Sequence, residues 1–146
     1  MAAAASQGAS AETGVVTRLL KAQDAGPDDV LAADGYIFAT PENLAAISGM
    51  MKDFFDRCYY PCLERLNGRP YAMLICAGSD GSNAARQITR IATGWRLKDV
   101  AEPLFICTHA QTPEAILAAK TISPGDLSQC EALGAAMATG LALGVF

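Results

Sequence analysis

The stretch of residues 33–57, ADGYIFATPENLAAISGMMKDFFDR, joins three unlike pieces. A short apolar run begins at Tyr36 and stops at a polar turn, residues 40–43, and a helical pattern begins near Ser48. Because the run lacks polar alternation, it is typical of a strand that is covered on both faces. Pro41 has no amide hydrogen, so we expect the strand to end there. The stretch predicts a buried strand, a polar turn and a helix.

Further apolar runs alternate with helical patterns along the chain. Residues 71–77, YAMLICA, and 103–108, PLFICT, predict buried strands, and the β-branched Val15 and Val16 favour a strand over residues 15–22. Helices are expected from Pro27 as a short turn, from Ser48, from a cap at Ser82 or Asn83 to about Gly94, and from Ser123-Pro124 onward. This alternation predicts an α/β domain with a parallel sheet and helices on both faces. No linker or repeat divides residues 1–146, so we expect a single domain.

Composition excludes several classes of protein. The formal net charge of −4, without a cluster of basic residues, argues against a nucleic-acid partner. No apolar stretch reaches the roughly 20 residues of a membrane helix, and the first ten residues lack the features of a secretory signal. We therefore expect a cytoplasmic protein without a membrane partner. Five cysteines and a single histidine offer no metal-ligand spacing, so they are interpreted as packed thiols and no metal is expected.

Polar and small residues follow the predicted strands where a ligand would bind. In parallel sheets, ligands lie outside the carboxyl ends of the strands, where neighbouring loops converge. Three loops meet this description: residues 40–43, 78–83 and 108–112. Pro41 stiffens the first loop and Asn43 offers both a donor and an acceptor, while Gly78 and Gly81 allow close approach of the backbone. Such loops suit a flat, hydrogen-bonding ring, although chain reversal alone also explains this composition.

A family resemblance favours the ring-binding interpretation. Residues 33–57 resemble the third strand, flavin loop and following helix of flavodoxin-like flavoproteins, which include the NADPH-dependent FMN reductases and the quinone reductases of the tryptophan-repressor-binding-protein type. The resemblance rests on Asp34-Gly35, Thr40-Pro41, Ser48-Gly49, Lys52 and Asp56-Arg57. Residues 71–88 resemble the fourth strand and second flavin loop of the same family. The resemblance implies a three-layer flavodoxin-like sandwich.

The resemblance also implies a cofactor, a reaction and a set of contacts. The cofactor is FMN, and the chemistry is hydride or electron transfer through the flavin, with NAD(P)H as a possible donor and a quinone or a flavin as the small-molecule acceptor. No side chain is assigned a catalytic role. The residues expected to contact FMN are Thr40, Pro41, Glu42, Asn43, Ala77, Gly78, Ser79, Asp80 and Gly81.

The sequence departs from the family pattern at its beginning. Family members open with a strand and a Ser/Thr-rich loop that holds the FMN phosphate, whereas MAAAASQGAS resembles the second half of the helix after that loop. The true start could lie upstream, which we favour, or the protein could be a shortened relative with repaired strand pairing, or another chain could fill the gap. An absent first strand would expose a sheet edge, so we expect a homo-oligomer or poor solubility.

Two functions remain open on the sequence alone. The first is an FMN-binding oxidoreductase, an NAD(P)H-dependent reductase of the flavin or quinone type. The alternative is a non-catalytic scaffold or interaction module that keeps the fold and has lost FMN binding. The two ring loops favour the first function, and the departure at the beginning of the chain favours the second.

Overall fold

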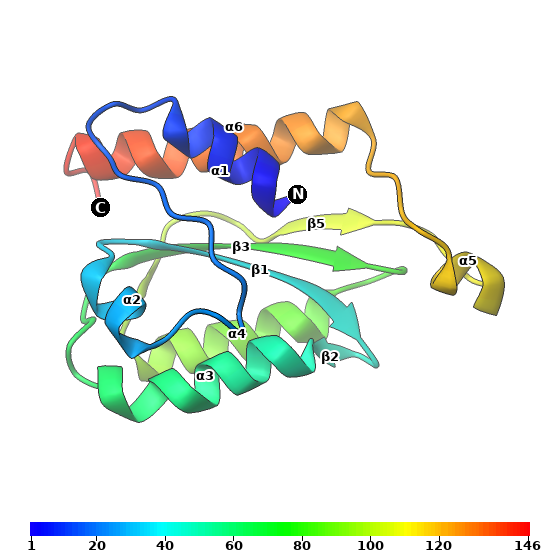
Figure 1. Ribbon diagram of the computed structural model, residues 1–146, viewed down its shortest axis with the longest axis horizontal. Coiled ribbons are helices and arrows are strands. Elements are labelled where there is room, and N and C mark those ends of the chain that lie inside the picture. Colours follow the sequence, from blue (N-terminus) through cyan, green and yellow to red (C-terminus); the bar gives the residue numbers. More distant parts are fainter.

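A computed structural model describes all of residues 1–146. Its parallel strands form a central layer, with α1 and α6 on one face and α2, α3 and α4 on the other (Figure 1). In chain order the elements are α1 (Ala2–Ser10), α2 (Pro27–Ala32), β1 (Tyr36–Asn43), β2 (Ala46–Ile47), α3 (Gly49–Cys62), β3 (Pro70–Ala77), α4 (Ser82–Gly94), β4 (Lys98–Asp99), β5 (Leu104–Cys107), α5 (Pro113–Leu117) and α6 (Pro124–Ala142). The three-layer flavodoxin-like sandwich is thus confirmed.

The sheet is built around β3. This strand pairs in parallel with β1, in a register that sets Tyr36 opposite Tyr71 and Pro41 opposite Cys76. Its other edge pairs with the short β4 near its start and with β5 near its end, both in parallel. All three longer strands therefore end at the same edge of the sheet, on the right in Figure 1. The carboxyl-end loops are brought together there.

The larger core lies between the sheet and the α2, α3 and α4 layer. Ser48 caps α3 by accepting a hydrogen bond from the Met51 amide. The apolar stripe of α3 is buried at Met51, Phe54, Phe55 and Cys58, whereas Met50, which its spacing also placed there, is exposed. Trp95, the fully buried residue that follows α4, lies edge-on to Phe55 and donates its indole hydrogen to the Tyr59 carbonyl. Aromatic packing of this kind fixes both helices against the sheet.

The opposite layer is the pair of helices α1 and α6, whose backbones meet at two glycines. A Cβ atom on Gly134 of α6 would lie 1.9 Å from the Ala5 carbonyl oxygen of α1. A Cβ atom on Gly8 of α1 would lie 2.0 Å from the Glu131 carbonyl oxygen of α6. The two backbones therefore touch, which only residues without a side chain permit at these positions. Gly134 of the C-terminal segment thus serves helix packing. No helix of the chain is long and apolar enough to cross a membrane.

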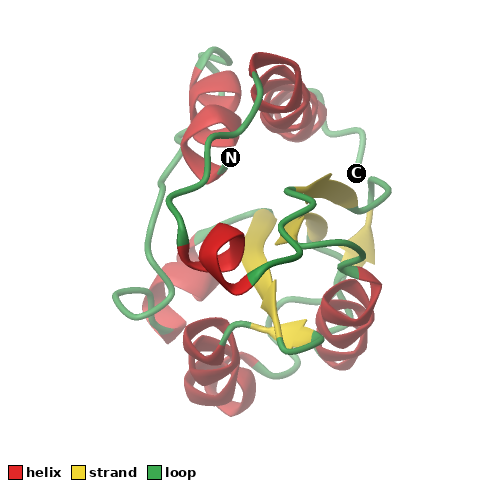
Figure 2. Cartoon of the chain, turned by 90° about the vertical axis from the view of Figure 1, so that its right-hand side faces the viewer, coloured by secondary structure: helices red, strands yellow, loops and turns green.

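Residues 15–22 are not a strand, contrary to the prediction from Val15 and Val16. They lie outside the edge of the sheet formed by β1, as both views show (Figures 1 and 2). No backbone amide or carbonyl of residues 16–20 has a backbone partner. A β-propensity becomes a strand only beside a neighbouring strand that supplies the ladder, and here none lies alongside. The predicted strand is thus an irregular segment, residues 15–22, whose middle has no backbone partner; it is called the strap below.

Two further differences from the prediction concern the end of β1 and the shortest elements. The strand does not stop at Pro41, because β1 continues to Asn43 and its last residues pair antiparallel with β2. Proline is tolerated there because β1 lies at the edge of the sheet over that part of its length, where a missing donor breaks no ladder. The short elements β2, β4 and α5 were also not predicted, since two to five residues carry too little periodic signal.

Candidate functional site at the carboxyl end of the sheet

The predicted ring loops meet at the carboxyl end of β1 and β3. Residues 40–43 form the end of β1, and residues 78–81 connect β3 to α4. Pro41 and Asn43 are exposed, as are Ser79 and Asp80 of the second loop. The structure thus brings the two predicted segments together on one surface, although their members play different roles.

Glu42 links the two loops directly. Its carboxylate accepts hydrogen bonds from the Gly81 amide at 2.9 Å and from the Ala84 amide at 3.3 Å. Both amides belong to the start of α4, where backbone donors have no partner within the helix and a negative charge is favoured by the helix dipole. The expected cap at Ser82 or Asn83 is therefore wrong, because α4 begins after Gly81 and is capped from another loop. Glu42 positions the loops, and both of its oxygens are engaged.

Thr40 is likewise committed to the protein. Its side chain is buried, and its hydroxyl oxygen accepts from the Ser48 amide at 3.2 Å and donates to the Pro41 carbonyl at 3.0 Å. Because Ser48 caps α3, this contact ties the end of β1 to the start of that helix. Of the first loop, Pro41 and Asn43 are the members left facing outward.

A tight turn at residues 44 and 45 connects β1 to β2, and side chains of α4 hold it in place. Leu44 and Ala45 both have positive φ, 51° and 56°, and the Leu44 side chain is fully exposed at the tip. The Asn83 side chain donates to the Ala45 carbonyl, and the Gln87 side chain accepts from the Ile47 amide at 3.1 Å. Sequence reasoning missed the turn-holding role of this pair. Its signal was the four-residue spacing, which places both side chains on one face of the helix.

The second loop presents backbone donors. The amides of Gly78, Ser79 and Asp80 donate to no protein group, whereas the Gly81 amide is used by Glu42. A Cβ atom on Gly78 would lie 3.6 Å from the Ala110 carbonyl oxygen, which is an ordinary van der Waals contact. Ala77 is buried at the end of β3, and its carbonyl accepts from the Thr108 amide. The loop therefore offers a short row of free amides to a ligand.

Gly81 is required for its backbone shape. Its φ is +85°, in the region that favours glycine, and a Cβ atom there would lie 2.9 Å from the Phe105 ring and 3.0 Å from Ile75. Asp80 bonds to its own loop, because its carboxylate accepts from the Ser82 hydroxyl at 2.6 Å. Both residues shape the turn into α4, and the amides of residues 78–80 stay without a hydrogen-bond partner.

The third loop follows β5. His109 is exposed with a φ of +54°, and the segment that leads into α5 projects from the carboxyl end of the sheet (Figure 1). Cys107 donates to the Ser79 carbonyl at a sulfur–oxygen distance of 3.5 Å, which joins this loop to the second one. The third loop thus borders the candidate site.

A cavity of about 190 Å³ opens beside the first loop. It is lined by Met1, Ala2, Ala39, Thr40, Pro41, Leu74 and Cys76. Burial raises the pKa of the Cys76 thiol above its ordinary value, so this cysteine is protonated at neutral pH and is no nucleophile. Pockets that enclose whole ligands typically measure about 300–1,000 Å³. The cavity suits a part of a ligand, and the rest would lie across the exposed loops.

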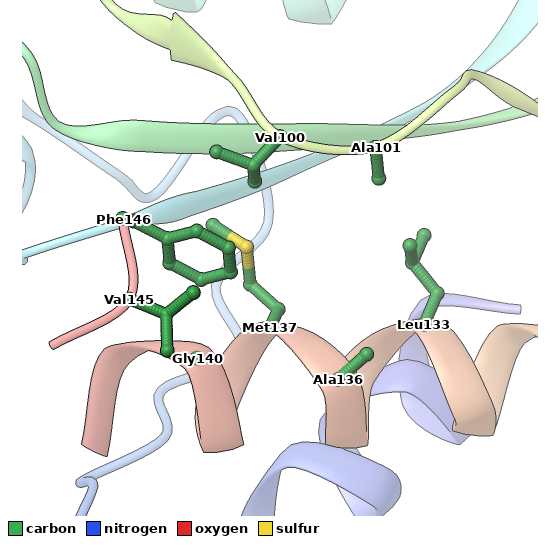
Figure 3. Close-up of a pocket in the computed structure, with 8 residues that line it drawn as sticks. All are labelled: Val100, Ala101, Leu133, Ala136, Met137, Gly140, Val145 and Phe146. Atoms are coloured by element: carbon green, nitrogen blue, oxygen red, sulfur yellow. The ribbon is translucent and has the colours of Figure 1, made fainter. Parts of the chain in front are cut away.

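A second cavity lies at the other end of the molecule. It measures about 220 Å³ and is lined almost entirely by apolar residues (Figure 3): Val100, Ala101, Leu133, Ala136, Met137, Gly140, Val145 and Phe146. The Phe146 ring packs on Gly140, where a Cβ atom would lie 2.2 Å from the ring. Since no polar side chain converges there, this cavity offers packing and no chemistry.

The residues at the carboxyl end fit the ring of FMN better than its phosphate. Free amides at residues 78–80 match the polar edge of an isoalloxazine ring, and exposed Pro41 and Asn43 border the same surface. The first turn of α1, by contrast, contains only alanines after Met1 and has no side-chain cap. A phosphate there would meet backbone donors without a hydroxyl.

The fold, together with ring loops at the carboxyl ends of β1 and β3, defines a flavodoxin-like α/β protein. The sequence pattern of NADPH-dependent FMN reductases matches residues 21–112, well over half of the chain, and the chain belongs to that family. Among curated proteins, none matches its sequence.

Solved structures share the fold at low sequence identity. A flavodoxin from the domain Archaea has a TM-score of 0.70 and 16% identity, over 95% of this chain and 86% of that one. A WrbA-like flavodoxin from Agrobacterium tumefaciens has a TM-score of 0.67 and 18% identity, over 97% of this chain and 87% of that one. An NADH:FMN oxidoreductase in its apo form has a TM-score of 0.54 and 19% identity, over 77% and 56% of the two chains. These likenesses concern the fold alone.

Proposed function

We propose that this chain is an FMN-dependent oxidoreductase whose flavin ring binds across residues 40–43 and 77–81. The observation that carries the proposal is the row of unpaired amides at residues 78–80, in a loop where Ser79 and Asp80 are exposed. Family membership supports the same cofactor. When bound, FMN would supply hydride or electron transfer, with NAD(P)H as donor and a quinone or a flavin as acceptor.

The protein's own residues would bind and orient the flavin. Amides of the second loop would donate to the polar edge of the ring, and Pro41 and Asn43 would border it. Glu42, Asn83 and Gln87 act through the loops, since their side chains bond to backbone groups and hold the turn against α4. Preorganised loops of this kind lower the ordering entropy that binding would otherwise cost.

The proposal is tested by titrating FMN and riboflavin with the protein and following flavin fluorescence. Because the contacts proposed here are with the flavin ring, we expect the two flavins to bind with dissociation constants within about threefold, a difference below about 0.7 kcal/mol. Gly78→Val should weaken both by tenfold or more, since its side chain would cover the free amides. Gly125→Ala on α6, remote from the loops, is the matched control and should leave both affinities unchanged.

The alternative function is a scaffold without flavin. The alanines at the start of α1 favour it, because a major anchor of FMN is not supplied by these residues. If neither flavin changes its fluorescence at high protein concentration while circular dichroism shows a folded chain, the loops are turns only. The oxidoreductase proposal would then give way to the scaffold.

A further inference from the structure

Helix α4 and the residues directly after it carry positive charge without any acid. Residues 81–98 contain no aspartate or glutamate and four basic residues: Arg86, Arg90, Arg96 and Lys98. The whole chain has eleven basic and fifteen acidic residues, so the rest of it has seven basic residues against the same fifteen acids. A locally basic segment thus stands in a chain whose net charge is −4.

The two arginines of α4 lie on its exposed side. Arg86 and Arg90 are exposed, as are the threonines between and after them, whereas the opposite side of the helix belongs to the larger core. Arg96 and Lys98, within four residues of the end of the helix, are exposed as well. The exposed side of α4 and these two residues are together called the basic face below.

The cations of the basic face lack the partners that most other cations of the chain have. Five cations elsewhere are bound to an aspartate or to backbone carbonyls: Arg18, Lys52, Arg57, Arg69 and Lys120. On the basic face, Arg90 and Lys98 form no side-chain hydrogen bond, and Arg86 donates only to a neutral amide side chain. The one ion pair there joins Arg96 to Glu64 at 3.8 Å, and it is exposed, so it contributes little.

Helix stability does not explain this arrangement. Arg86 and Arg90 are four residues apart, and like charges at that spacing destabilise a helix. The negative charge that stabilises the start of α4 comes from Glu42 in another loop, and the helix carries no acidic residue of its own. A partner that brings negative charge would relieve the repulsion between the two arginines.

We propose that the basic face binds an acidic segment of a partner protein. The face follows a helix of 13 residues, about 20 Å long, and neither of the two cavities includes a residue of α4. A surface of this length without a pocket fits a protein better than a small molecule, and opposite charges would steer the partner toward it. Nucleic acid fits less well, because the acid-rich remainder of the chain would repel its phosphates.

The basic face adjoins the proposed flavin site. Helix α4 begins directly after Gly81, the last residue of the second loop, so a protein bound here would lie beside the flavin loops. The proposal rests on the charges of α4 and does not require the flavin. It adds a protein to the small-molecule acceptor as a partner of this chain.

The test titrates the flavin-free chain against a peptide of eight glutamate–glycine repeats that carries a neutral fluorophore, and follows the anisotropy. A control peptide has glutamine in place of glutamate. Because the chain and the acidic peptide are both negative overall, attraction requires a local basic surface. We expect the glutamate peptide to bind at least about tenfold tighter than the control at about 20 mM salt. Its affinity should fall at least about tenfold at about 200 mM salt, where the charges are screened. A negative flavin titration would leave this result unchanged.

Two charge reversals locate the binding surface. Arg90→Glu should weaken binding of the glutamate peptide at least about fivefold. Lys21→Glu makes the same change in net charge at an exposed site on the strap and should change the affinity less than about twofold. Should a variant fail to fold, the comparison of the two peptides on the unmodified chain still decides.

Three results of these titrations overturn the proposal: equal weakening by both variants, equal binding of both peptides, and no binding at low salt. A chain that sediments as a dimer, and as a monomer after Arg90→Glu, also overturns it, because the face would then hold a second copy of this chain.

Discussion

At the scale of single residues, the contact between α1 and α6 depends on the absence of a side chain at position 134. The Gly134 backbone lies so close to Ala5 that a methyl group has no room, and the neighbouring atom is a carbonyl oxygen that cannot swing away. Gly125 in the first turn of the same helix differs, because the nearest atom to its Cβ would be the Ser123 hydroxyl at 3.8 Å. The two glycines form a matched pair.

We predict opposite effects of alanine at these two positions. Gly134→Ala gains about 1 kcal/mol of helix propensity but separates the helices, and overpacking typically costs about 1–3 kcal/mol, so the free energy of unfolding should fall by about 1–2 kcal/mol. Gly125→Ala meets no obstacle and should raise it by about 0.4–1 kcal/mol. Urea denaturation of both variants measures the difference. A stabilising Gly134→Ala would show that the helices are not in backbone contact.

Sequence patterns alone do not reveal such contacts. Gly134 lies in a segment that is rich in glycine and alanine, and nothing in the spacing says which glycine meets another backbone. Glu42 illustrates the same limit, since nothing in the sequence showed that its carboxylate is bonded to the start of α4. A Gly-rich loop was predictable at residues 78–81, but the sequence did not show that Glu42 uses the Gly81 amide while those of residues 78–80 stay unpaired.

At the scale of elements, Glu42 couples the end of β1 to the start of α4. We predict that Glu42→Ala lowers the free energy of unfolding by about 1–2 kcal/mol, the usual cost of losing a helix cap, because two amides lose their acceptor. It should also weaken flavin binding severalfold, since the second loop loses its fixed position. Urea denaturation and flavin titration measure the two effects.

Glu102→Ala is the control for this prediction, because Glu102 is exposed and its side chain bonds to no group. It should leave both the stability and the flavin affinity unchanged. If Glu42→Ala loses stability and keeps full flavin affinity, the contact of Glu42 with the start of α4 supports the fold alone. The assignment of residues 78–80 as ligand donors would then not depend on Glu42.

Long elements were predictable, and those that depend on a neighbour were not. The strands at β1 and β3 and the helices α3 and α6 follow from apolar runs, from spacing and from the caps Ser48 and Ser123. The strap has the composition of a strand, yet Val16 is 90% exposed because no strand lies beside it. Pairing is a property of two segments, so the sequence of one segment cannot establish it.

At the scale of the whole molecule, burial sets how the thiols and phenols respond to pH. It raises the pKa of Cys58 to about 11, from an ordinary value of 9.0. It also raises the pKa of Cys62, Cys130, Tyr36 and Tyr71, in each case as the largest cause. All of these groups are neutral acids when protonated, so the folded state keeps their protons to higher pH than the unfolded chain does.

The stability of the protein should therefore fall in alkali. The contribution of Cys58 to stability is fully present below about pH 9 and is lost as the pH rises to about 11. The total loss is roughly 2–3 kcal/mol for a pKa difference of about two units. Urea denaturation in a phosphine reductant at pH 8 and pH 10.5 should show this loss. Cys58→Ala should reduce the difference between the two pH values, whatever its effect on stability at pH 8, and Leu143→Ala, at an exposed site without a titratable group, should not. An unfolding free energy that is flat from pH 8 to 10.5 would mean that these side chains meet solvent, and that the packed core between the sheet and α3 is open.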